Sequence, residues 1–141
     1  MKNLKIKEVI EATGGKPYKI KEKMSGTIEG ISTDSRTINR GDLFFALKGE
    51  NYNGHDFLKE AMNKSCIPAV SEKKKRGNLI IVKDTLKALG DLAKYYREKI
   101  DPEVIAITGS VGKTTTKDFL GKLFSETVNT LISYRNFNNL I

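Results

Sequence analysis

Apolar residues recur with two different periods in the first part of the chain, and together they predict a domain of helices and strands. From Leu4 to Ala12 they recur at helical spacing and stop at Gly14 and Gly15. This pattern predicts a short helix that ends at the two glycines. From Thr27 to Thr33 apolar and polar residues alternate, which is typical of a strand.

Three short apolar runs predict strands in the same domain, and the first is expected to be largely buried. They span Asp42 to Leu47, Ile67 to Val70 and Leu79 to Val82. A helix is expected between the first two runs. The turn before it is built from Asn51, Asn53 and Gly54, and its apolar face consists of Phe57, Leu58, Ala61 and Met62.

A longer helix is predicted from Asp84 to Ile100. Asp84 is well placed to cap the first turn. The residues that recur at three- and four-residue steps are Leu86, Leu89, Ala93, Tyr96 and Ile100. Pro102 disfavours helix at Asp101, so we expect a domain boundary near residue 101. The residues before it suffice for a small independent core.

The segment after this boundary predicts a strand, a helix and a second strand. Val104 to Ile107 is a short apolar run, and the helix from Thr114 to Glu126 places Phe119, Leu120, Leu123 and Phe124 on one face. The predicted fold class is α/β, with a small mixed domain over 1–101 and the first βαβ unit of a second domain over 102–141. One βαβ unit cannot cover both faces of its sheet. Residues 102–141 are therefore expected to pack on the first domain, to swap into a partner chain or to be held weakly.

A glycine-rich turn joins the predicted strand to the predicted helix. Its residues are Gly109, Ser110, Val111, Gly112, Lys113, Thr114 and Thr115. In such a turn glycines let backbone N–H groups converge on an anion at the positive end of the helix. Lys113 would add a charge for the β and γ phosphates, and the Thr114 hydroxyl would coordinate Mg²⁺. The turn predicts a site for nucleotide phosphates.

This turn departs from the general phosphate-loop pattern at one position. Five positions before Gly112 the chain has Ile107, where that pattern has glycine. The alternative is that the glycines serve only a tight strand-to-helix turn and that Lys113 is solvated.

The formal net charge of +8 raises the question of nucleic acid binding. The basic residues are spread along the chain, and the densest cluster, Lys73 to Arg76, is followed by Gly77 and Asn78. That arrangement is typical of a solvated loop between strands. Aromatic residues are not interleaved with it as base stacking requires, so no nucleic acid partner is expected.

The remaining composition predicts a soluble protein of the cytoplasm. No apolar stretch reaches the roughly 18 to 20 residues of a membrane span, and the start, MKNLKIKEVI, has no apolar signal-peptide region. Cys66 is the single cysteine and has no partner for an internal disulfide. We expect it to be a buried thiol in a reducing compartment.

The turn from Thr108 to Thr115 resembles the ATP-binding loop of the Mur ligases, which build the peptide stem of bacterial peptidoglycan. A second match strengthens this. Ser32 to Arg36, Gly41 to Gly49 and Asn53 to Phe57 resemble the amino-terminal nucleotide-sugar-binding domain of that family. Asn136 to Asn139 is most similar to the branch that joins D-alanyl-D-alanine to UDP-MurNAc-tripeptide. The branch that adds the third stem residue is the alternative.

The resemblance implies an ATP-dependent, amide-forming ligase that uses Mg²⁺. In the family, ATP phosphorylates the substrate's terminal carboxylate, and the incoming amine attacks the acyl phosphate. At the matching positions, Lys113 and Thr114 would be catalytic, Thr114 would also bind the metal, and residues 109–115 would hold ATP. The nucleotide-sugar would be bound by Asp34, Ser35, Arg36, Lys48, Gly49, Asn53, His55, Asn138 and Asn139.

Several of these roles have structural alternatives. Asp34 and Arg36 could merely brace a loop as a local ion pair. His55 could belong to a turn in which Asp56 caps the next helix. Asn138 and Asn139 could be simple turn residues.

The resemblance runs from about Ile6 to Ile141, whereas Mur ligases have three domains. The later metal ligands, the adenine-contacting region and the carboxy-terminal domain that brings the amino substrate have no counterpart in this sequence. Turnover by this chain alone is therefore not expected. A non-catalytic module that holds a nucleotide-sugar is the second interpretation, and a small basic nucleic-acid-binding protein is the third.

Overall fold

The computed structural model describes residues 4–20, 27–50, 52–65 and 67–133. The chain divides into two compact units, Met1–Asp101 and Pro102–Ile141, and each is described by itself. The first unit is a mixed α/β fold, which confirms the predicted class.

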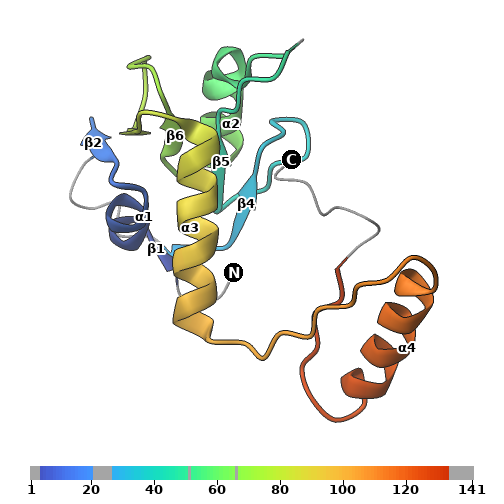
Figure 1. Cartoon of the computed structure of the whole chain (residues 1–141). Helices are drawn as coiled ribbons and strands as arrows, with labels where there is room; N and C mark the ends of the chain where they lie inside the picture. The colour runs from blue at the N-terminus through green and yellow to red at the C-terminus, as the bar shows by residue number, and fades with distance from the viewer. Residues whose placement is uncertain (1–3, 21–26, 51, 66, 134–141) are drawn as a thin grey trace. The chain divides into compact units, whose positions relative to one another are not determined.

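The first unit is built on a five-stranded sheet with the strand order β2-β7-β6-β5-β4 (Figure 1). Its strands are β2 (Lys16–Tyr18), β4 (Gly30–Ser32), β5 (Asp42–Phe45), β6 (Ala69–Ser71) and β7 (Leu79–Ile81). Strands β4, β5, β6 and β7 are parallel to one another, and β2 is antiparallel to β7. A separate two-stranded sheet pairs β1 (Leu4–Lys5) with β3 (Thr27–Ile28).

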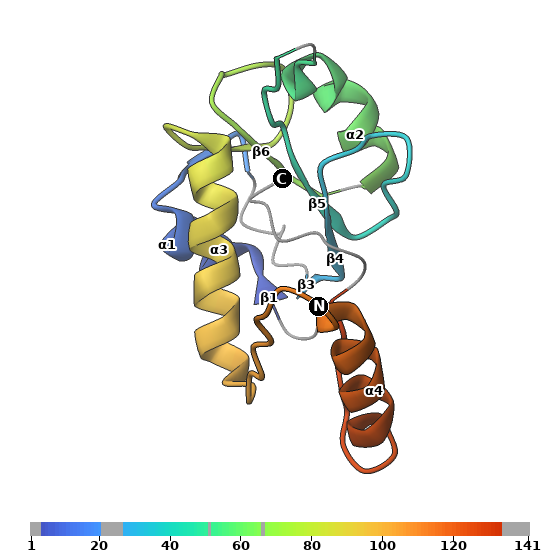
Figure 2. The same cartoon turned by 45° about the vertical axis from the view of Figure 1, so that its right-hand side comes forward.

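Helices cover both faces of the larger sheet. On one face α1 (Ile6–Thr13) packs against α3 (Thr85–Ile100). On the other, the 3-10 helix η1 (Gly54–Phe57) leads into α2 (Leu58–Ser65). Figures 1 and 2 both show α3 beside α1.

Strand β5 shows how the apolar pattern of the sequence builds two cores. Leu43 and Phe45 belong to the core formed with α1 and α3, whereas Phe44 and the following Ala46 belong to the core formed with α2. All four side chains are fully buried. Successive residues of a strand point to opposite faces, so a strand covered on both faces needs a continuous apolar run.

The predicted ends of α1 and α3 are confirmed. After α1 the chain turns at Gly14, whose φ of 60° is left-handed and favours glycine. Asp84 caps α3, because its carboxylate accepts a 2.8 Å hydrogen bond from the N–H of Lys87. That helix ends at Ile100, two residues before Pro102.

Two features of the strands differ from the sequence prediction. The stretch from Thr27 to Thr33 is not one strand, because β3 and β4 belong to different sheets and Glu29 lies between them. The N–H of Glu29 donates instead to the carbonyl of Gly41 at 3.0 Å. The sequence pattern also does not predict β2, which contains Pro17. Proline has no N–H to donate, and an edge strand tolerates that loss.

The buried face of α3 lies one position earlier than predicted. Its buried residues are Thr85, Ala88 and Leu92, whereas Leu86 and Ile100 are exposed. Thr85 explains the difference, because its buried hydroxyl lies within hydrogen-bond distance of the carbonyl of Ala46, at 3.1 Å, and of the Glu72 carboxylate, at 2.9 Å. A buried polar residue therefore sets the rotation of the helix, and an apolar pattern does not reveal it.

The second unit contains one helix among its described residues, α4 (Lys113–Ser125), close to the predicted span. The predicted strand from Val104 to Ile107 is wrong, because these residues form no strand and Val104 and Ile105 are exposed. A strand needs a neighbour that pairs with its backbone. The described residues of this unit supply none after α4 either, so the second predicted strand is not formed up to residue 133.

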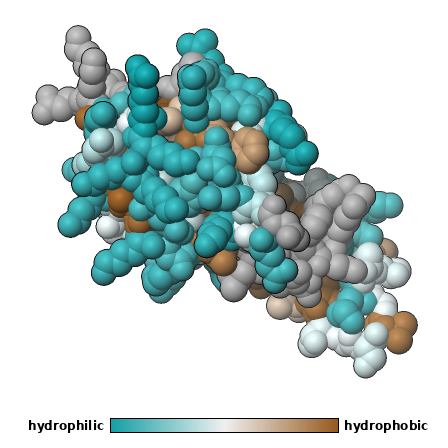
Figure 3. Space-filling model, turned by 90° about the horizontal axis from the view of Figure 1, so that it is seen from above, coloured by the Kyte–Doolittle hydropathy of each residue, from teal (hydrophilic) through white to brown (hydrophobic). Residues whose placement is uncertain are grey.

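Hydrophilic residues cover most of the face that Figure 3 shows, with small hydrophobic areas between them. The basic cluster from Lys73 to Arg76 is exposed and connects β6 to β7, as predicted. Among the described helices, none combines the length and apolarity that crossing a membrane requires. Cys66 lies outside the described residues.

Candidate functional site

The loop after β4 is organised by an ion pair between Asp34 and Arg36. Nε of Arg36 donates to both carboxylate oxygens of Asp34, at 2.9 and 3.1 Å, and Nη2 donates to Oδ2 at 2.6 Å. The backbone N–H of Arg36 donates to Oδ1 at 2.9 Å. Ser32 closes the turn with a 2.9 Å hydrogen bond from its Oγ to the carbonyl of Asp34. The two charged residues therefore do brace this loop.

This pairing keeps Asp34 ionised and Arg36 oriented. The hydrogen bonds from the Arg36 side chain, followed by the one from its backbone N–H, lower the pKa of Asp34 from 3.8 to about 2. The Arg36 side chain is nevertheless 84 % exposed, so N–H groups of its guanidinium remain accessible to a ligand. An oriented guanidinium loses less freedom on binding than a mobile one.

Ser35 points toward α2 and away from solvent. It is buried, and its Oγ lies 3.4 Å from Oε2 of Glu60. Lys64 bridges the same elements, because its Nζ donates to the carbonyl of Ser35 at 2.9 Å and to Oε1 of Glu60 at 2.8 Å. Ser35 thus anchors the loop to α2, and its predicted contact with the nucleotide-sugar stays a prediction.

A tight turn after β5 places Lys48 opposite Asn53. The two residues form an isolated antiparallel bridge, and the N–H of Gly49 donates to the carbonyl of Tyr52 at 2.8 Å. Lys48 and Gly49 are exposed. Lys48 and Tyr52 therefore lie exposed on the turn that connects β5 to η1.

Asn53, and not Asp56, caps the helix that follows this turn. Oδ1 of Asn53 accepts a 3.2 Å hydrogen bond from the N–H of His55. Asp56 instead forms a 3.1 Å ion pair with Lys75. The predicted cap by Asp56 is wrong because the 3-10 turn η1 precedes α2 and moves the cap to its own start.

His55 is buried, and both of its ring nitrogens have partners. Nδ1 lies 2.9 Å from Oδ1 of Asn53, and Nε2 accepts a 3.2 Å hydrogen bond from the N–H of Glu72. Because a backbone N–H only donates, the proton of the neutral ring lies on Nδ1. Burial lowers the pKa of His55. His55 therefore links η1 to the residue after β6, and its predicted substrate contact stays a prediction.

Asp34, Arg36 and Tyr52 border one pocket. Together with Thr33 they line a cavity of about 250 Å³. The Tyr52 ring stacks on Phe57, with centroids 5.4 Å apart and planes inclined by 12°. Phe57, which was predicted to belong to a buried helix face, is half-exposed and supports Tyr52. The loop after β4 and the turn after β5 thus form one site.

Sequence reasoning missed Tyr52. The asparagines and the glycine around Tyr52 predict a turn and indicate no role for the tyrosine. A usable signal was present, because an aromatic residue inside a polar turn is exposed unless the turn folds over it, and binding residues concentrate in such loops.

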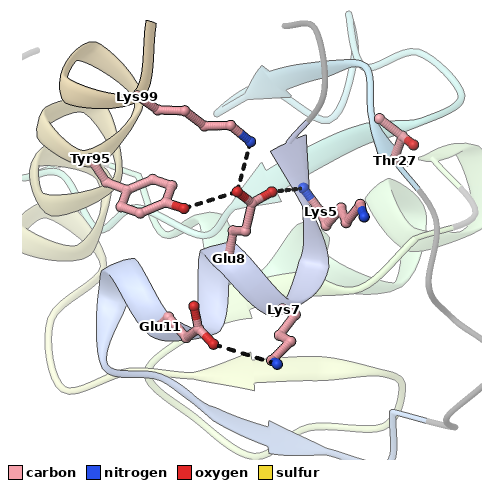
Figure 4. A pocket seen from close by; sticks show the side chains of 7 residues that line it. All are labelled: Lys5, Lys7, Glu8, Glu11, Thr27, Tyr95 and Lys99. Atoms are coloured by element: carbon pink, nitrogen blue, oxygen red, sulfur yellow. Dashed lines mark hydrogen bonds and ion pairs between the residues drawn. The ribbon is translucent and has the colours of Figure 1, made fainter. Parts of the chain in front are cut away.

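A larger cavity of about 620 Å³ lies beside α1 and α3. It is lined by Lys5, Lys7, Glu8, Glu11, Thr27, Tyr95 and Lys99. Figure 4 shows Tyr95 and Lys99 of α3 converging on the Glu8 carboxylate of α1. None of the predicted site residues lines this cavity, and its central carboxylate serves to join two helices.

The glycine-rich turn of the second unit leads into the N-terminus of α4. Gly112 is the N-cap with a φ of 80°, and it has no side chain that could bond the N–H groups of the first turn. Nζ of Lys113 donates to the carbonyl of Gly109 and closes the turn. Residues 108–116 are exposed. Accessible N–H groups at the positive end of a helix, beside a lysine, fit a phosphate group.

A metal at this turn would need further oxygen ligands. In the described part of the chain, no group of three or more His, Cys, Asp or Glu side chains could hold an ion. Asn138 and Asn139, which were predicted to contact the substrate, lie outside the described residues.

Comparison with known proteins places this arrangement in a family. The family described as "Mur ligase family, catalytic domain" matches residues 27–76, which include the Asp34–Arg36 loop and the turn with Tyr52. A crystal structure of MurF from Acinetobacter baumannii covers 95 % of this chain with 40 % sequence identity and a TM-score of 0.82. The chain belongs to the Mur ligase family.

Two further members of the Mur ligase family show what the similarity covers. The UDP-N-acetylmuramoyl-tripeptide--D-alanyl-D-alanine ligase of Haemophilus influenzae is 40 % identical over 119 residues, which are 79 % of this chain and 26 % of that protein. A MurF ligase from Thermotoga maritima, in complex with ADP, covers 77 % of this chain at 31 % identity with a TM-score of 0.57. The chain spans about a quarter of the length of the curated relatives it matches.

Proposed function

We propose that this chain is part of an ATP-dependent, amide-forming ligase that joins D-alanyl-D-alanine to UDP-MurNAc-tripeptide in peptidoglycan synthesis, and that its first unit binds the nucleotide-sugar. The pocket beside the paired Asp34 and Arg36, within the stretch that matches the family, carries the proposal. The name of the Haemophilus influenzae relative describes this reaction and supports the choice of substrates.

The residues of the first unit divide into binding and positioning groups. Arg36 and Lys48 are exposed cations at the pocket and at the neighbouring turn, and they would attract the diphosphate. Ser35 and His55 are buried and fix the loop and the turn on which those cations stand. The two loops that would contact the substrate are thus fixed by buried residues.

The second unit would hold the nucleotide. The N–H groups at the start of α4 and the ammonium of Lys113 would bind its phosphates, and Thr114 would bind Mg²⁺. ATP, when bound, supplies the phosphoryl group that activates a carboxylate. Lys113 neutralises negative charge at that position. Since the chain spans only a quarter of its relatives, we expect binding and not turnover from it alone.

Calorimetric titration of the chain with UDP-MurNAc-tripeptide tests this proposal. UDP-MurNAc-dipeptide, UDP, and ATP with Mg²⁺ are titrated in parallel. Saturable binding that prefers the tripeptide ligand is expected, whereas a preference for the dipeptide ligand would assign the chain to the branch that adds the third stem residue. If no uridine ligand binds, the proposed role of the first unit is wrong. Binding that ignores the uridine and weakens steeply with salt would indicate nucleic acid instead.

A further inference from the structure

Two segments of the first unit come together as a basic surface. Residues 16–19, which form β2 and the position after it, contain Lys16 and Lys19, and the connection from β6 to β7 contains Lys73 to Arg76. All of these cations are exposed, and neither segment contains an acidic residue. The pairing of β2 with β7 brings the two segments side by side (Figure 1). We call these cations, together with Tyr18, the basic surface.

Tyr18 joins the two segments of the basic surface. Nζ of Lys19 lies 5.3 Å from the centroid of the Tyr18 ring, and Nζ of Lys74 lies 5.8 Å from it. Both distances are typical of cation–π contacts. The ring is half-buried and packs against the core formed with α2. Two ammonium groups are thus held near each other despite their like charge, and an anion that binds there relieves their repulsion.

The connection from β6 to β7 is anchored to the fold. Nζ of Lys75 donates a 2.9 Å hydrogen bond to the carbonyl of His55. Gly77 approaches α2 so closely that a Cβ at this position would collide with Met62. A loop that is already positioned loses little freedom when a partner binds. The basic surface is therefore ordered before it meets a partner.

Most of the charge on this surface is not neutralised nearby. Lys75 pairs with Asp56 at 3.1 Å. The other three cations of the connection form no ion pair with a carboxylate within the described ranges. Glu72, which precedes them, directs its carboxylate to the N–H of Thr85 at 2.9 Å. The surface thus presents a net positive charge that attracts an anionic partner.

The residue types of the surface distinguish between anionic partners. The centre of a protein–protein interface is depleted of lysine and rich in aromatic residues, and none of the large exposed apolar side chains of the described residues lies on these two segments. Single-stranded nucleic acid binds where bases stack on free aromatic rings, whereas the ring of Tyr18 has ammonium groups against it. A lipid surface requires neither feature, because its anionic headgroups attract clustered lysines by charge alone.

We propose that the basic surface binds the anionic headgroups of a lipid bilayer and so holds the first unit at a membrane surface. Each lysine or arginine near such a bilayer raises the affinity by about fivefold. The attraction acts over about 10 Å at 0.1 M salt, so binding is reversible and weakens as salt is added. The inference is independent of the proposed function, because the basic surface shares no residue with the pocket beside Asp34 and Arg36.

Co-sedimentation of the full chain with lipid vesicles tests this inference. Vesicles of phosphatidylcholine alone are compared with vesicles of phosphatidylcholine and phosphatidylglycerol in equal parts. The wild type is expected to bind only the anionic vesicles and to be released by added salt. The double variant Lys73→Gln/Lys74→Gln should bind them about 25-fold more weakly. Its unfolding transition should be unchanged, because both side chains are exposed.

Lys7→Gln/Lys94→Gln is the matched control. It removes the same charge from exposed positions of α1 and α3, which cover the other face of the sheet, and it should bind nearly as tightly as the wild type. An equal loss in both double variants would show that net charge, and not this surface, drives binding, and the inference would be wrong. Failure of the wild type to bind anionic vesicles would overturn it directly.

Two further outcomes would assign the binding to other features. Binding to the neutral vesicles that Lys73→Gln/Lys74→Gln retains would point to exposed apolar side chains such as Phe119 and Leu123 of α4, and not to the basic surface. Tighter binding of the wild type to an RNA duplex than to anionic vesicles, at equal phosphate concentration, would make the surface a nucleic-acid site. Either result would overturn the inference, whereas binding of UDP-MurNAc-tripeptide is expected to be the same in both double variants.

Discussion

The carboxylate of Glu8 in the first turn of α1 lies 2.6 Å from Nζ of Lys99 in the last turn of α3. The hydroxyl of Tyr95 donates to the same carboxylate oxygen at 2.9 Å, and the N–H of Lys5 donates to the other at 2.9 Å. Residues at the two ends of the first unit's sequence are thereby joined on one face of the sheet.

Glu8→Gln is expected to lower the stability of the first unit at neutral pH and to reduce its sensitivity to acid. The hydrogen bond from Lys99, followed by those from Lys5 and Tyr95, lowers the pKa of Glu8 from 4.5 to about 2. A carboxyl group with a lowered folded pKa stabilises the fold above its unfolded pKa and loses that contribution as the pH falls from about 4.5 toward 2. Urea unfolding across this pH range measures the difference.

Glu11→Gln is the matched control on the same helix. Glu11 is exposed and its carboxylate lies 3.9 Å from Nζ of Lys7, and such surface pairs contribute little. Its unfolding curves should follow the wild type at every pH. Identical pH profiles for Glu8→Gln and the wild type would contradict the role assigned to the Glu8–Lys99 pair.

The single histidine of the chain gives a second pH prediction. Burial lowers the pKa of His55 below 6.5, so the unfolded chain takes up this proton at a higher pH than the folded chain. Stability is therefore expected to decrease as the pH falls below about 6.5, and His55→Gln should lack this slope. Titration of the ring signals by NMR measures the pKa directly, and a value at or above 6.5 would show that the ring is not buried as described.

Two leucines of α3 predict opposite results for the same substitution. Leu92 is fully buried in the core shared with α1, whereas Leu86 is 41 % exposed. Leu92→Ala should lower the free energy of unfolding by about 2–5 kcal/mol through lost burial and a new cavity. Leu86→Ala should change it by less than about 1 kcal/mol. Denaturant unfolding compares them, and equal losses would show that Leu86 is as buried as Leu92 and would contradict the described orientation of α3.

The sequence predicts those parts of the first unit whose signal lies within the segment itself. The run around Phe44 and Phe45 is apolar because both faces of β5 are covered, and Asp84 caps α3 with its own side chain. The parts it does not predict depend on distant partners. Glu29 interrupts a strand by bonding to Gly41, and Thr85 rotates α3 by bonding to Ala46.

The same distinction holds for the candidate site. Asp34 and Arg36 could be found because they are close in sequence and pair with each other. The sequence leaves the role of His55 open between a turn residue and a substrate contact, and its bond to the N–H of Glu72 is visible only in the fold. Tyr52 became a candidate through the cavity it shares with the Asp34 loop. The residue types indicate the chemistry of the site, whereas the fold determines which residues line it.

Amide exchange is expected to differ sharply between the two units. Within α4 only Gly121 is buried, and Phe119 and Leu123 are more than half exposed. Among the described residues, Ile132 packs at Gly121 and Lys117 bonds to the carbonyl of Ser133, and a helix of 13 residues with so little packed surface is marginal in water. Its amides should exchange much faster than those of β5 and β7 in the core. Uniformly slow exchange across residues 104–132 in a dilute monomer would contradict the expectation that this unit is only weakly ordered. Protection that grows with protein concentration would indicate a swap between chains.

Arg36→Lys tests whether the geometry of the Asp34–Arg36 pair matters or only its charge. Lysine keeps the charge but loses the planar fork that now bonds both oxygens of Asp34. We expect binding of UDP-MurNAc-tripeptide to weaken about tenfold, with an unchanged unfolding transition because the pair is exposed. Arg40→Lys, at an exposed position of the same connection, is the matched control and should bind as the wild type. If both variants bind equally well, the oriented guanidinium is not part of the nucleotide-sugar site, and the pocket must be assigned another ligand.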